Sequence, residues 1–286
     1  MRYEAPTTTK AAVSLMAKAK SRAYVLAGGT DLLVRLKSGA IEPELIVDIK
    51  RIEATQSIKQ TASGFRIGAA VPAVAMRKSA ALSRAWPGVV EAANLIGSDQ
   101  IQGRCTIAGN LCNASPAADS VPALVAAGAK AVVVGPKGRR TVAVEKIATG
   151  PGRTSLAKGE IVEYITLPKR PLRTGDAFLR FIPRSEMDIA VVNAGVCLTL
   201  NRKGEVTKAR VVLGAVAPTV VLVAEAADAI VGTRLDDDAL AELASACEKA
   251  CHPIDDMRGT IEFRIDVAGV LARRAAKIAY QRAGGK

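Results

Sequence analysis

The segment TIAGNLCNASPAAD, Thr106–Asp119, stands apart from the rest of the chain in composition. Small residues, two Asn, a Ser-Pro pair and a closing Asp interrupt a sequence otherwise rich in Val, Leu, Ile and Ala. Gly, Asn, Ser, Pro and Asp all favour turns over helices and strands. We therefore expect a long structured segment that is a poor helix and a poor strand, and whose polar side chains either satisfy its own backbone or bind a ligand.

Several residues of this segment suit a ligand. Gly109 and the alanines leave the backbone within reach of a bound molecule. Asp119 can accept two hydrogen bonds from the hydroxyls of a ribose or a ribityl chain. The other candidate polar side chains are Thr106, Asn110, Asn113 and Ser115.

A second candidate motif is AGGTD, Ala27–Asp31, between an expected strand and an expected helical turn. Its glycines allow a sharp turn and a close backbone approach, so that successive N–H groups can converge on an anion. A helix start favours phosphate through its dipole, and Thr30 adds a hydroxyl. A plain strand-to-helix turn is the alternative. Together with the segment at 106–119, the motif could clamp a dinucleotide from two sides.

Hydrophobic periodicity predicts an α/β half followed by a sheet-plus-helix half. In the first half we expect helices at 12–20, 32–37, 72–79, 87–96 and 121–127, and strands at 24–27, 45–49, 65–69, 131–134 and 161–167. The segment KRPLRTG, 169–175, is the expected linker. Beyond it we expect a hairpin of strands 190–200 and 208–216 around the turn NRKGE, then helices at 220–230, 236–251 and 262–283.

Composition narrows the protein class. The chain has 286 residues and 49% hydrophobic residues, enough for a sizeable core. No apolar run approaches the length of a membrane span, and no secretory signal is evident, so we expect a cytoplasmic protein. The net charge of +13 admits a basic scaffold or a nucleic-acid-binding protein as an alternative. Lys and Arg are spread without basic runs, however, and aromatics make up only 3%.

Catalytic motifs are scarce. There is one histidine, and nucleophile elbows, Walker loops and dinucleotide fingerprints are missing from the sequence. Cys247, Cys251 and His252 lie close together but make a poor zinc site, so we predict no metal site and no catalytic residue in this chain. A cofactor-holding unit fits this pattern better than a self-contained hydrolase.

The two motifs also carry a family resemblance. AGGTDLL followed by TIAGNLCNASPAADSVPAL resembles the FAD-binding medium subunit of the molybdenum hydroxylases, the group of carbon monoxide dehydrogenase, the xanthine dehydrogenases and 4-hydroxybenzoyl-CoA reductase. The resemblance covers nearly the whole chain. It extends to VVLGAVAPTVVLVAEAA, which looks like the family's last strand and following helix, and to DDMRGTIEFRIDVAGVLARRA, which looks like its closing helix.

The resemblance implies an α+β fold and a role in a complex. An FAD-binding domain of the PCMH/VAO type, with two α/β subdomains at about 1–55 and 56–170, would precede a C-terminal domain of antiparallel sheet plus helices at 176–286. The chain would be an electron-transfer subunit that passes electrons from iron–sulfur clusters to an external acceptor. A large subunit would hold the molybdenum cofactor and a small subunit the [2Fe-2S] clusters, in a dimer of heterotrimers without nucleic acid or membrane.

Site residues follow from the resemblance by position. The first motif would line the FAD pyrophosphate, the second would form the opposite wall, a strand would pack near the adenine or flavin, and the C-terminal domain would cover part of the cofactor. The residues implied are Ala27, Gly28, Gly29, Thr30, Asp31, Leu32, Thr106, Ala108, Gly109, Asn110, Asn113, Ser115, Asp119, Ile161 and Val162.

Three positions depart from the family pattern. Ala108 stands where relatives have glycine, Gln102-Gly103 where they have Arg-Asn, and Ile182-Pro183 where they often have a basic residue. We expect these departures to bear on flavin tuning and on the electron acceptor more than on the binding mode.

Overall fold

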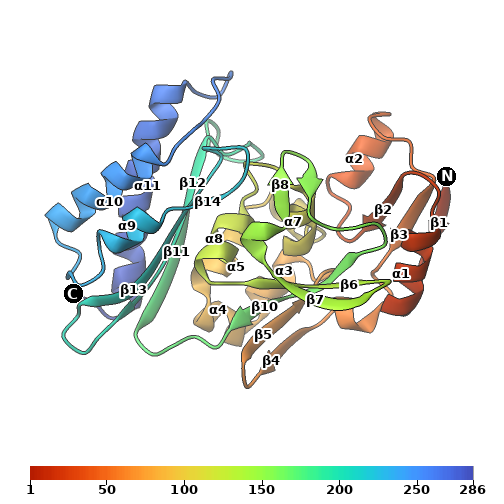
Figure 1. The fold of residues 1–286 in the computed structure, drawn as a ribbon, viewed down its shortest axis with the longest axis horizontal. Coiled ribbons are helices and arrows are strands. Elements are labelled where there is room, and N and C mark those ends of the chain that lie inside the picture. Colours follow the sequence, from red (N-terminus) through yellow and green to blue (C-terminus); the bar gives the residue numbers. More distant parts are fainter. Residues whose placement is uncertain (286) are drawn as a thin grey trace.

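The computed structural model describes residues 1–285 as an α+β fold of separate sheets flanked by helices, which confirms the expected class (Figure 1). At the N-terminal end, β1 (Arg2–Glu4) and β2 (Ala23–Leu26) both run parallel to β3 (Leu45–Asp48) between them. Helices α1 (Thr9–Lys18) and α2 (Leu32–Lys37) make the crossovers. All four residues of β3 are buried, as a central parallel strand requires. Strand β1 is too short for the periodicity to have revealed it.

The second unit is built on a five-stranded antiparallel sheet. Its order is β4 (Ile58–Thr61), β5 (Gly64–Gly68), β10 (Ile161–Pro168), β6 (Lys130–Gly135) and β7 (Gly138–Ala143). The segment GPKGRR turns at Pro136-Lys137 and continues into β7. A small hairpin pairs β8 (Ala148–Gly150) with β9 (Arg153–Thr154).

Short helices fill the long connection between β5 and β6. They are α3 (Ala73–Lys78), α4 (Ala80–Ala85), α5 (Pro87–Ala93), α6 (Asp99–Gln102), α7 (Ile107–Asn113) and α8 (Ser120–Ala126), and two 3₁₀ turns, η1 (Glu53–Thr55) and η2 (Val144–Lys146), lie elsewhere in this half.

The expectation that 106–119 makes a poor helix is wrong for its first half, because Ile107–Asn113 is helix α7. The Thr106 side chain accepts a hydrogen bond from Gly109 N at 2.9 Å, which caps the helix start. Ile107 and Leu111 are fully buried, four residues apart on one face. Burial and capping thus override the low helix propensity of the Gly and Asn residues. Ala114, at φ +52°, then ends the helix in the left-handed conformation.

The C-terminal half is a four-stranded antiparallel sheet covered by helices. The strands β11 (Thr174–Phe181), β12 (Val192–Leu200), β13 (Val206–Gly214) and β14 (Val221–Leu222) pair in sequence order. Helices α9 (Ala224–Asp228), α10 (Asp237–Lys249) and α11 (Ile261–Arg282) follow. The expected hairpin and the last two helices are present. The helix expected at 220–230 is present as α9 but shorter, since its expected start is β14, and the expected linker at 169–175 already contains the start of β11.

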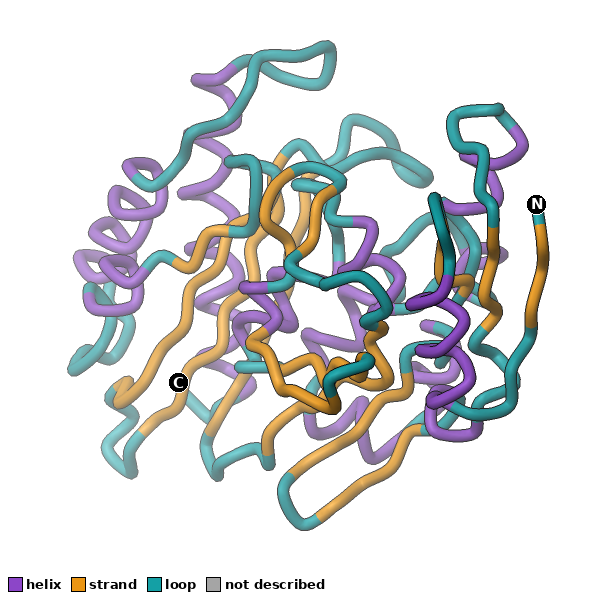
Figure 2. The backbone as a smooth tube through the Cα atoms, turned by 45° about the vertical axis from the view of Figure 1, so that its right-hand side comes forward, coloured by secondary structure: helices purple, strands orange, loops and turns teal. Residues whose placement is uncertain are grey.

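The sheet of the C-terminal half lies between two layers of helices (Figures 1 and 2). Helix α11 packs along β11 and β12, whereas α5 and α8 of the first half pack on β11, β12 and β13. Gly195 permits the close approach of α8, because a Cβ there would lie 2.7 Å from Pro122 O. The second half therefore rests directly on the helix that follows the 106–119 segment. Within residues 1–285, every helix is too short or too polar to span a bilayer.

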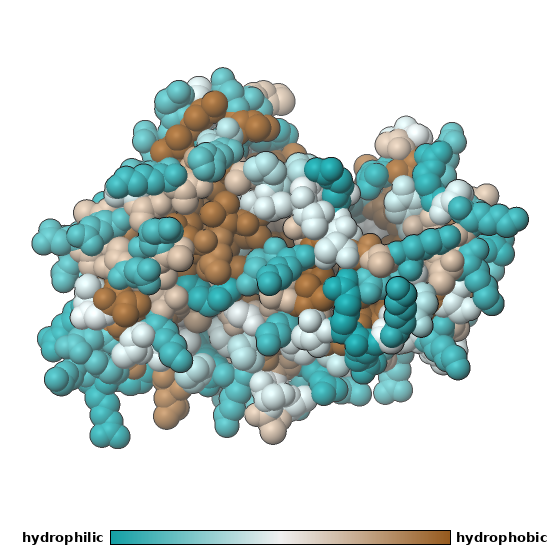
Figure 3. Space-filling view, in the orientation of Figure 1, coloured by the Kyte–Doolittle hydropathy of each residue, from teal (hydrophilic) through white to brown (hydrophobic). Residues whose placement is uncertain are grey.

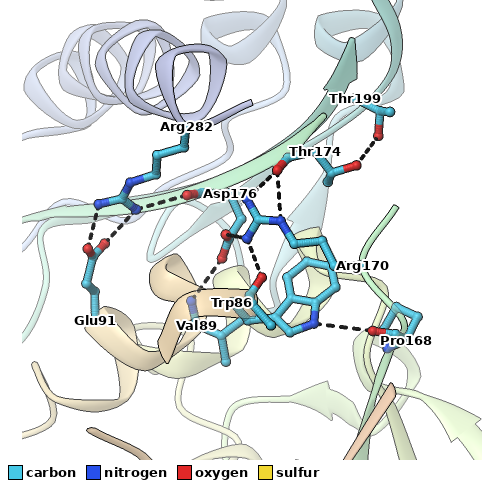
Figure 4. Close-up of polar contacts among 10 residues, drawn as sticks. Trp86, Val89, Glu91, Pro168, Arg170, Thr174, Asp176, Thr199 and Arg282 are labelled. Carbon is cyan, nitrogen blue, oxygen red and sulfur yellow. Dashed lines mark hydrogen bonds and ion pairs between the residues drawn. The ribbon is translucent and has the colours of Figure 1, made fainter. Parts of the chain in front are cut away.

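A buried cluster of polar contacts joins the two halves at the linker (Figure 4). The Arg170 guanidinium donates to Asp176 Oδ1 at 2.9 Å and to the carbonyls of Ala85 and Thr174, and it lies over the Trp86 ring at 5.6 Å. Asp176 Oδ2 in turn accepts from Val89 N at 3.2 Å. Burial raises the pKa of Asp176, and the positive charge of Arg170 opposes that rise. The cluster fixes the position of the start of β11 relative to α4 and α5 of the first half.

Replacing Arg170 with Met should destabilise the protein by about 3–5 kcal/mol, because it leaves the Asp176 carboxylate buried without its counter-charge. The midpoint of urea unfolding measures this loss. Arg84→Met, at an exposed arginine of the neighbouring helix α4, is the matched control and should shift the midpoint little. Equal stability of the two variants would contradict a structural role for the cluster.

Candidate functional site

A cavity among the described residues has a volume of about 630 Å³, within the range of cofactor and ligand pockets. It lies between the N-terminal parallel unit and the wall formed by α7 and the start of β10. The space-filling view shows the surface dipping between the lobe that carries α2 and the central part of the molecule (Figure 3). The residues around the cavity all fall between Met16 and Val162.

Gly28 brings the two sequence motifs into contact. A Cβ at this position would lie 2.2 Å from Arg104 O and 3.0 Å from Cys105 Cα, so only glycine lets the first motif pack on the backbone that leads into the second. Gly29 has φ +81°, a left-handed conformation that side chains rarely adopt. Ala27 is held as well, since its carbonyl accepts from Lys50 Nζ at 3.2 Å. The motif is therefore a fixed, backbone-lined cradle.

Helix α7 forms the opposite wall through Thr106, Ala108, Gly109, Asn110 and Asn113. A Cβ at Gly109 would lie 2.9 Å from the capping oxygen Thr106 Oγ1, so the small residue protects the cap. Ala108 is buried in an ordinary helical position, and its methyl belongs to the main hydrophobic core. The methyl that distinguishes this position from glycine thus has a packing role.

Asn110 links the two helices of this wall. Its Oδ1 accepts from Ser120 N at 3.1 Å and from Ser120 Oγ at 2.7 Å, which ties α7 to the first turn of α8. Among residues 1–285, its Nδ2 donates to no protein group, so the amide retains a donor on the side chain that lines the cavity. Asn110 can therefore brace the wall and still offer a hydrogen bond to a ligand.

All but two of the site residues expected from the sequence surround this cavity. The residues that line it are Ala27, Gly28, Gly29, Thr30, Asp31, Leu32, Thr106, Ala108, Gly109, Asn110, Asn113, Ile161 and Val162. Ser115 lies instead beside a small void near Pro218, and its Oγ accepts from Ala117 N at 3.3 Å. Within residues 1–285, no residue of the C-terminal half lines the cavity, although we expected that half to cover part of the cofactor.

Asp119 is not among the lining residues either. Its Oδ1 accepts from Arg180 Nη1 at 3.0 Å, an ion pair in which the two side chains are only 13% and 8% exposed. Burial raises the pKa of Asp119 to about 6, and the charge and hydrogen bond of Arg180 limit the rise. The negative charge of Asp119 also helps to raise the pKa of Cys105, which does line the cavity. Asp119 is therefore close to the cavity but already has a protein partner.

Sequence reasoning missed the third side of the cavity. It is made by the end of α1, by Tyr24 and Val25 of β2, and by the β9–β10 connection. Gly159, at φ +84°, packs this connection on Ala17 of α1, and Gly152 N donates to Ala114 O at 3.0 Å. The glycines of this region were the available sequence signal. They are separated from both motifs along the chain, so spacing alone did not connect them to the site.

The chemistry available in the cavity is that of binding. Lys20, Arg35 and Lys158 line it and make no ion pair within residues 1–285, so they can face an anionic ligand. Burial raises the pKa of Cys105 to about 11 and that of Cys112 to about 12, so both thiols are protonated at neutral pH and neither is an activated nucleophile. No group of three or more potential metal ligands occurs within residues 1–285.

Two family models together match nearly the whole chain. The FAD binding domain in molybdopterin dehydrogenase matches residues 1–170, and the CO dehydrogenase flavoprotein C-terminal domain matches residues 177–279. The chain belongs to the FAD-binding medium subunits of the molybdenum hydroxylases. The family resemblance noted in the sequence is thus confirmed.

Individual relatives agree along their full lengths. The carbon monoxide dehydrogenase medium chain of Afipia carboxidovorans is 33% identical, over 98% of this medium subunit and 97% of the relative. The xanthine dehydrogenase FAD-binding subunit of Escherichia coli O157:H7 is 28% identical, over 99% and 97%. A solved structure of reconstituted CO dehydrogenase from Oligotropha carboxidovorans superposes with a TM-score of 0.94 at 32% identity, covering 99% of this chain and 98% of that one.

The remaining departures from the family pattern lie outside the cavity lining. Gln102 is buried, with Nε2 donating to Asn94 O at 2.6 Å, and Gly103 ends α6. Ile182-Pro183 follows β11, and the next residue, Arg184, pairs with Asp188 at 3.1 Å. Their influence on the flavin stays a prediction.

Replacing Gly28 with Ala should weaken FAD binding by about 1–3 kcal/mol, because the new methyl pushes the first motif away from Arg104. The FAD dissociation constant of the purified chain measures the effect. Gly103→Ala is the control, since a Cβ there has no neighbour closer than 3.4 Å and the backbone is unstrained. Unchanged affinity in Gly28→Ala would show that the contact between the motifs does not shape the cavity.

Proposed function

We propose that this medium subunit holds FAD in the described cavity and passes electrons from iron–sulfur clusters to an external acceptor. The observation that carries the proposal is the cavity itself, which is walled on two sides by the glycine motif at 27–31 and by α7. The cradle fits the cofactor, because the glycine motif borders the cavity with little side-chain bulk and the exposed cavity cations suit a diphosphate. Bound FAD would supply redox chemistry that takes up electrons singly and releases them singly or in pairs.

The chain's own residues would bind and orient the cofactor. Backbone N–H groups at Gly28–Asp31 would face the diphosphate, with Thr30 adding a hydroxyl. Asn110 and Asn113 would hydrogen-bond the cofactor from the opposite wall, and the Asp119 carboxylate would hold ribose or ribityl hydroxyls through Oδ2, which has no partner within residues 1–285. Ile161 and Val162 would pack against an aromatic ring of FAD. The protein thereby supplies position and electrostatics rather than acid–base groups.

The proposal extends to the assembly. We propose that substrate oxidation takes place on a molybdenum-containing large subunit, that [2Fe-2S] clusters lie on a small subunit, and that the complex is a cytoplasmic dimer of heterotrimers. We also propose a functional division of this chain into an FAD-binding domain at 1–170, with subdomains at about 1–55 and 56–170, and a C-terminal domain at 176–286. The names of the relatives, which are medium chains and FAD-binding subunits, support this arrangement.

The purified chain should be yellow, with a flavin absorption band and one FAD released per chain on acid precipitation. Absorption spectroscopy and chromatography of the released cofactor give the measurement. A colourless chain that does not take up FAD on reconstitution would contradict the proposal.

The basic charge favours one alternative, a non-redox scaffold or a nucleic-acid-binding protein. That function requires affinity for duplex or single-stranded nucleic acid that falls steeply with salt, since counterions are released on binding. Filter-binding titrations at 50 and 200 mM salt, as rough bounds of the sensitive range, decide between the two. We expect no salt-dependent binding.

A further inference from the structure

We propose that Arg180 is a positioning residue for the cofactor, which lets the C-terminal half control FAD binding without touching FAD. The inference rests on the proposed function, because it assumes that FAD occupies the described cavity. Arg180 lies on β11, and none of the residues that line the cavity comes from that strand. Arg180 must therefore affect FAD binding indirectly, through the residues that form the cavity wall.

The path from the cavity to Arg180 consists of direct contacts. Asn110 lines the cavity and holds the first turn of α8 through Ser120. Asp119 directly precedes that turn, and its Oδ1 accepts from Arg180 Nη1 at 3.0 Å. The cavity wall is thus connected to Asp119, whose carboxylate forms an ion pair with Arg180 of the C-terminal half. Both side chains of this pair are largely buried.

Two further hydrogen bonds connect the 114–126 segment to the C-terminal half. Ala215 N donates to Pro116 O at 2.8 Å, and Arg210 Nε donates to Val125 O at 2.9 Å at the far end of α8. These bonds use main-chain carbonyls of the segment and hold it at two points. Arg180 supplies the only ion pair to this segment within residues 1–285.

The surroundings of Arg180 give its charge few alternatives. Its partner in register on β12 is Asn193, which is fully buried and whose Nδ2 and Oδ1 have no partner within residues 1–285. An uncharged replacement at 180 would remove the one positive charge that lowers the pKa of Asp119. A buried carboxylate without a counter-charge takes up a proton, and its hold on the wall and on a cofactor hydroxyl then changes.

Protonation offers a readout that a merely structural residue would not move. The groups that face Asp119 are Arg180 from β11 and, through its charge, the Cys105 thiol, whose pKa of about 11 keeps it neutral over the pH range of interest. With a pKa of about 6, Asp119 is ionised and paired at pH 8 and protonated at pH 5. If FAD binds best to the paired form, affinity falls as the pH drops through about 6.

The test measures the FAD dissociation constant of the full-length chain between about pH 5 and 8 by quenching of flavin fluorescence. In Arg180→Met, affinity at pH 8 should fall about tenfold, and the pH dependence near 6 should disappear. Arg180→Lys, which keeps a cation, should restore most of the affinity and the pH dependence. Arg202→Met, at an exposed arginine of the β12–β13 turn, is the control and should match the unmodified chain.

Asp119→Asn provides an independent arm if Arg180→Met does not fold. This isosteric variant should bind FAD without pH dependence, at about the affinity of the unmodified chain at pH 5. Wild-type affinity with the same pH dependence in either foldable variant would overturn the role of Arg180 while leaving FAD binding intact. Failure of the unmodified chain to bind FAD at any pH is a distinguishable result, which would overturn the proposed function itself.

Discussion

The cavity depends on an approach of two backbones, at Gly28 and Arg104, that is too close for any side chain. Because these residues belong to distant parts of the sequence, the contact fixes the N-terminal parallel unit against the wall that begins at Thr106. The width of the cavity then follows from main-chain geometry rather than from flexible side chains. The wall itself is secured in turn, since Thr106 caps α7 and Asn110 fastens α7 to α8. Binding residues are thereby positioned before any ligand arrives, which lowers the entropic cost of binding.

Much of this arrangement could be predicted from the sequence, because it depends on local chemistry. The buried strands, the hairpin around NRKGE and the long C-terminal helices all have the periodicity and turn residues that such elements require. Both motifs were assigned to one site. Glycine allows a ligand to approach the backbone and asparagine can hydrogen-bond it, whatever the detailed conformation of the segment. Nearly all the residues expected to bind FAD lie around one cavity, and their contacts with the cofactor stay a prediction.

The errors have physical causes that a single sequence does not display. Helix α7 forms despite its Gly and Asn residues, because tertiary burial of Ile107 and Leu111 outweighs propensity. Ser115, which the resemblance implied as part of the second wall, follows the left-handed residue Ala114 and lies beside a small void near Pro218, so its role toward FAD stays a prediction. The third side of the cavity at 152–160 comes from a segment with no motif of its own. Long-range packing places such segments, and spacing cannot reveal it.

The two halves of the molecule are less separate than their different sheets suggest. One hydrophobic core spans the first half and reaches Val212, whereas the other is confined to the C-terminal sheet and its helices. Helix α8 contributes residues to the first core and also packs against one face of the C-terminal sheet. A residue on either side of this layer can therefore influence the other half through packing alone.

The buried cluster around Arg170 and Asp176 has a mechanical meaning (Figure 4). The guanidinium of Arg170, in the linker, contacts two carbonyls, a carboxylate and an indole ring. These contacts restrain the linker, so it does not act as a hinge between the two halves. These contacts hold the two halves of the chain together at the linker. Any protein that docks on one half is thereby held at a fixed distance from the cavity in the other half.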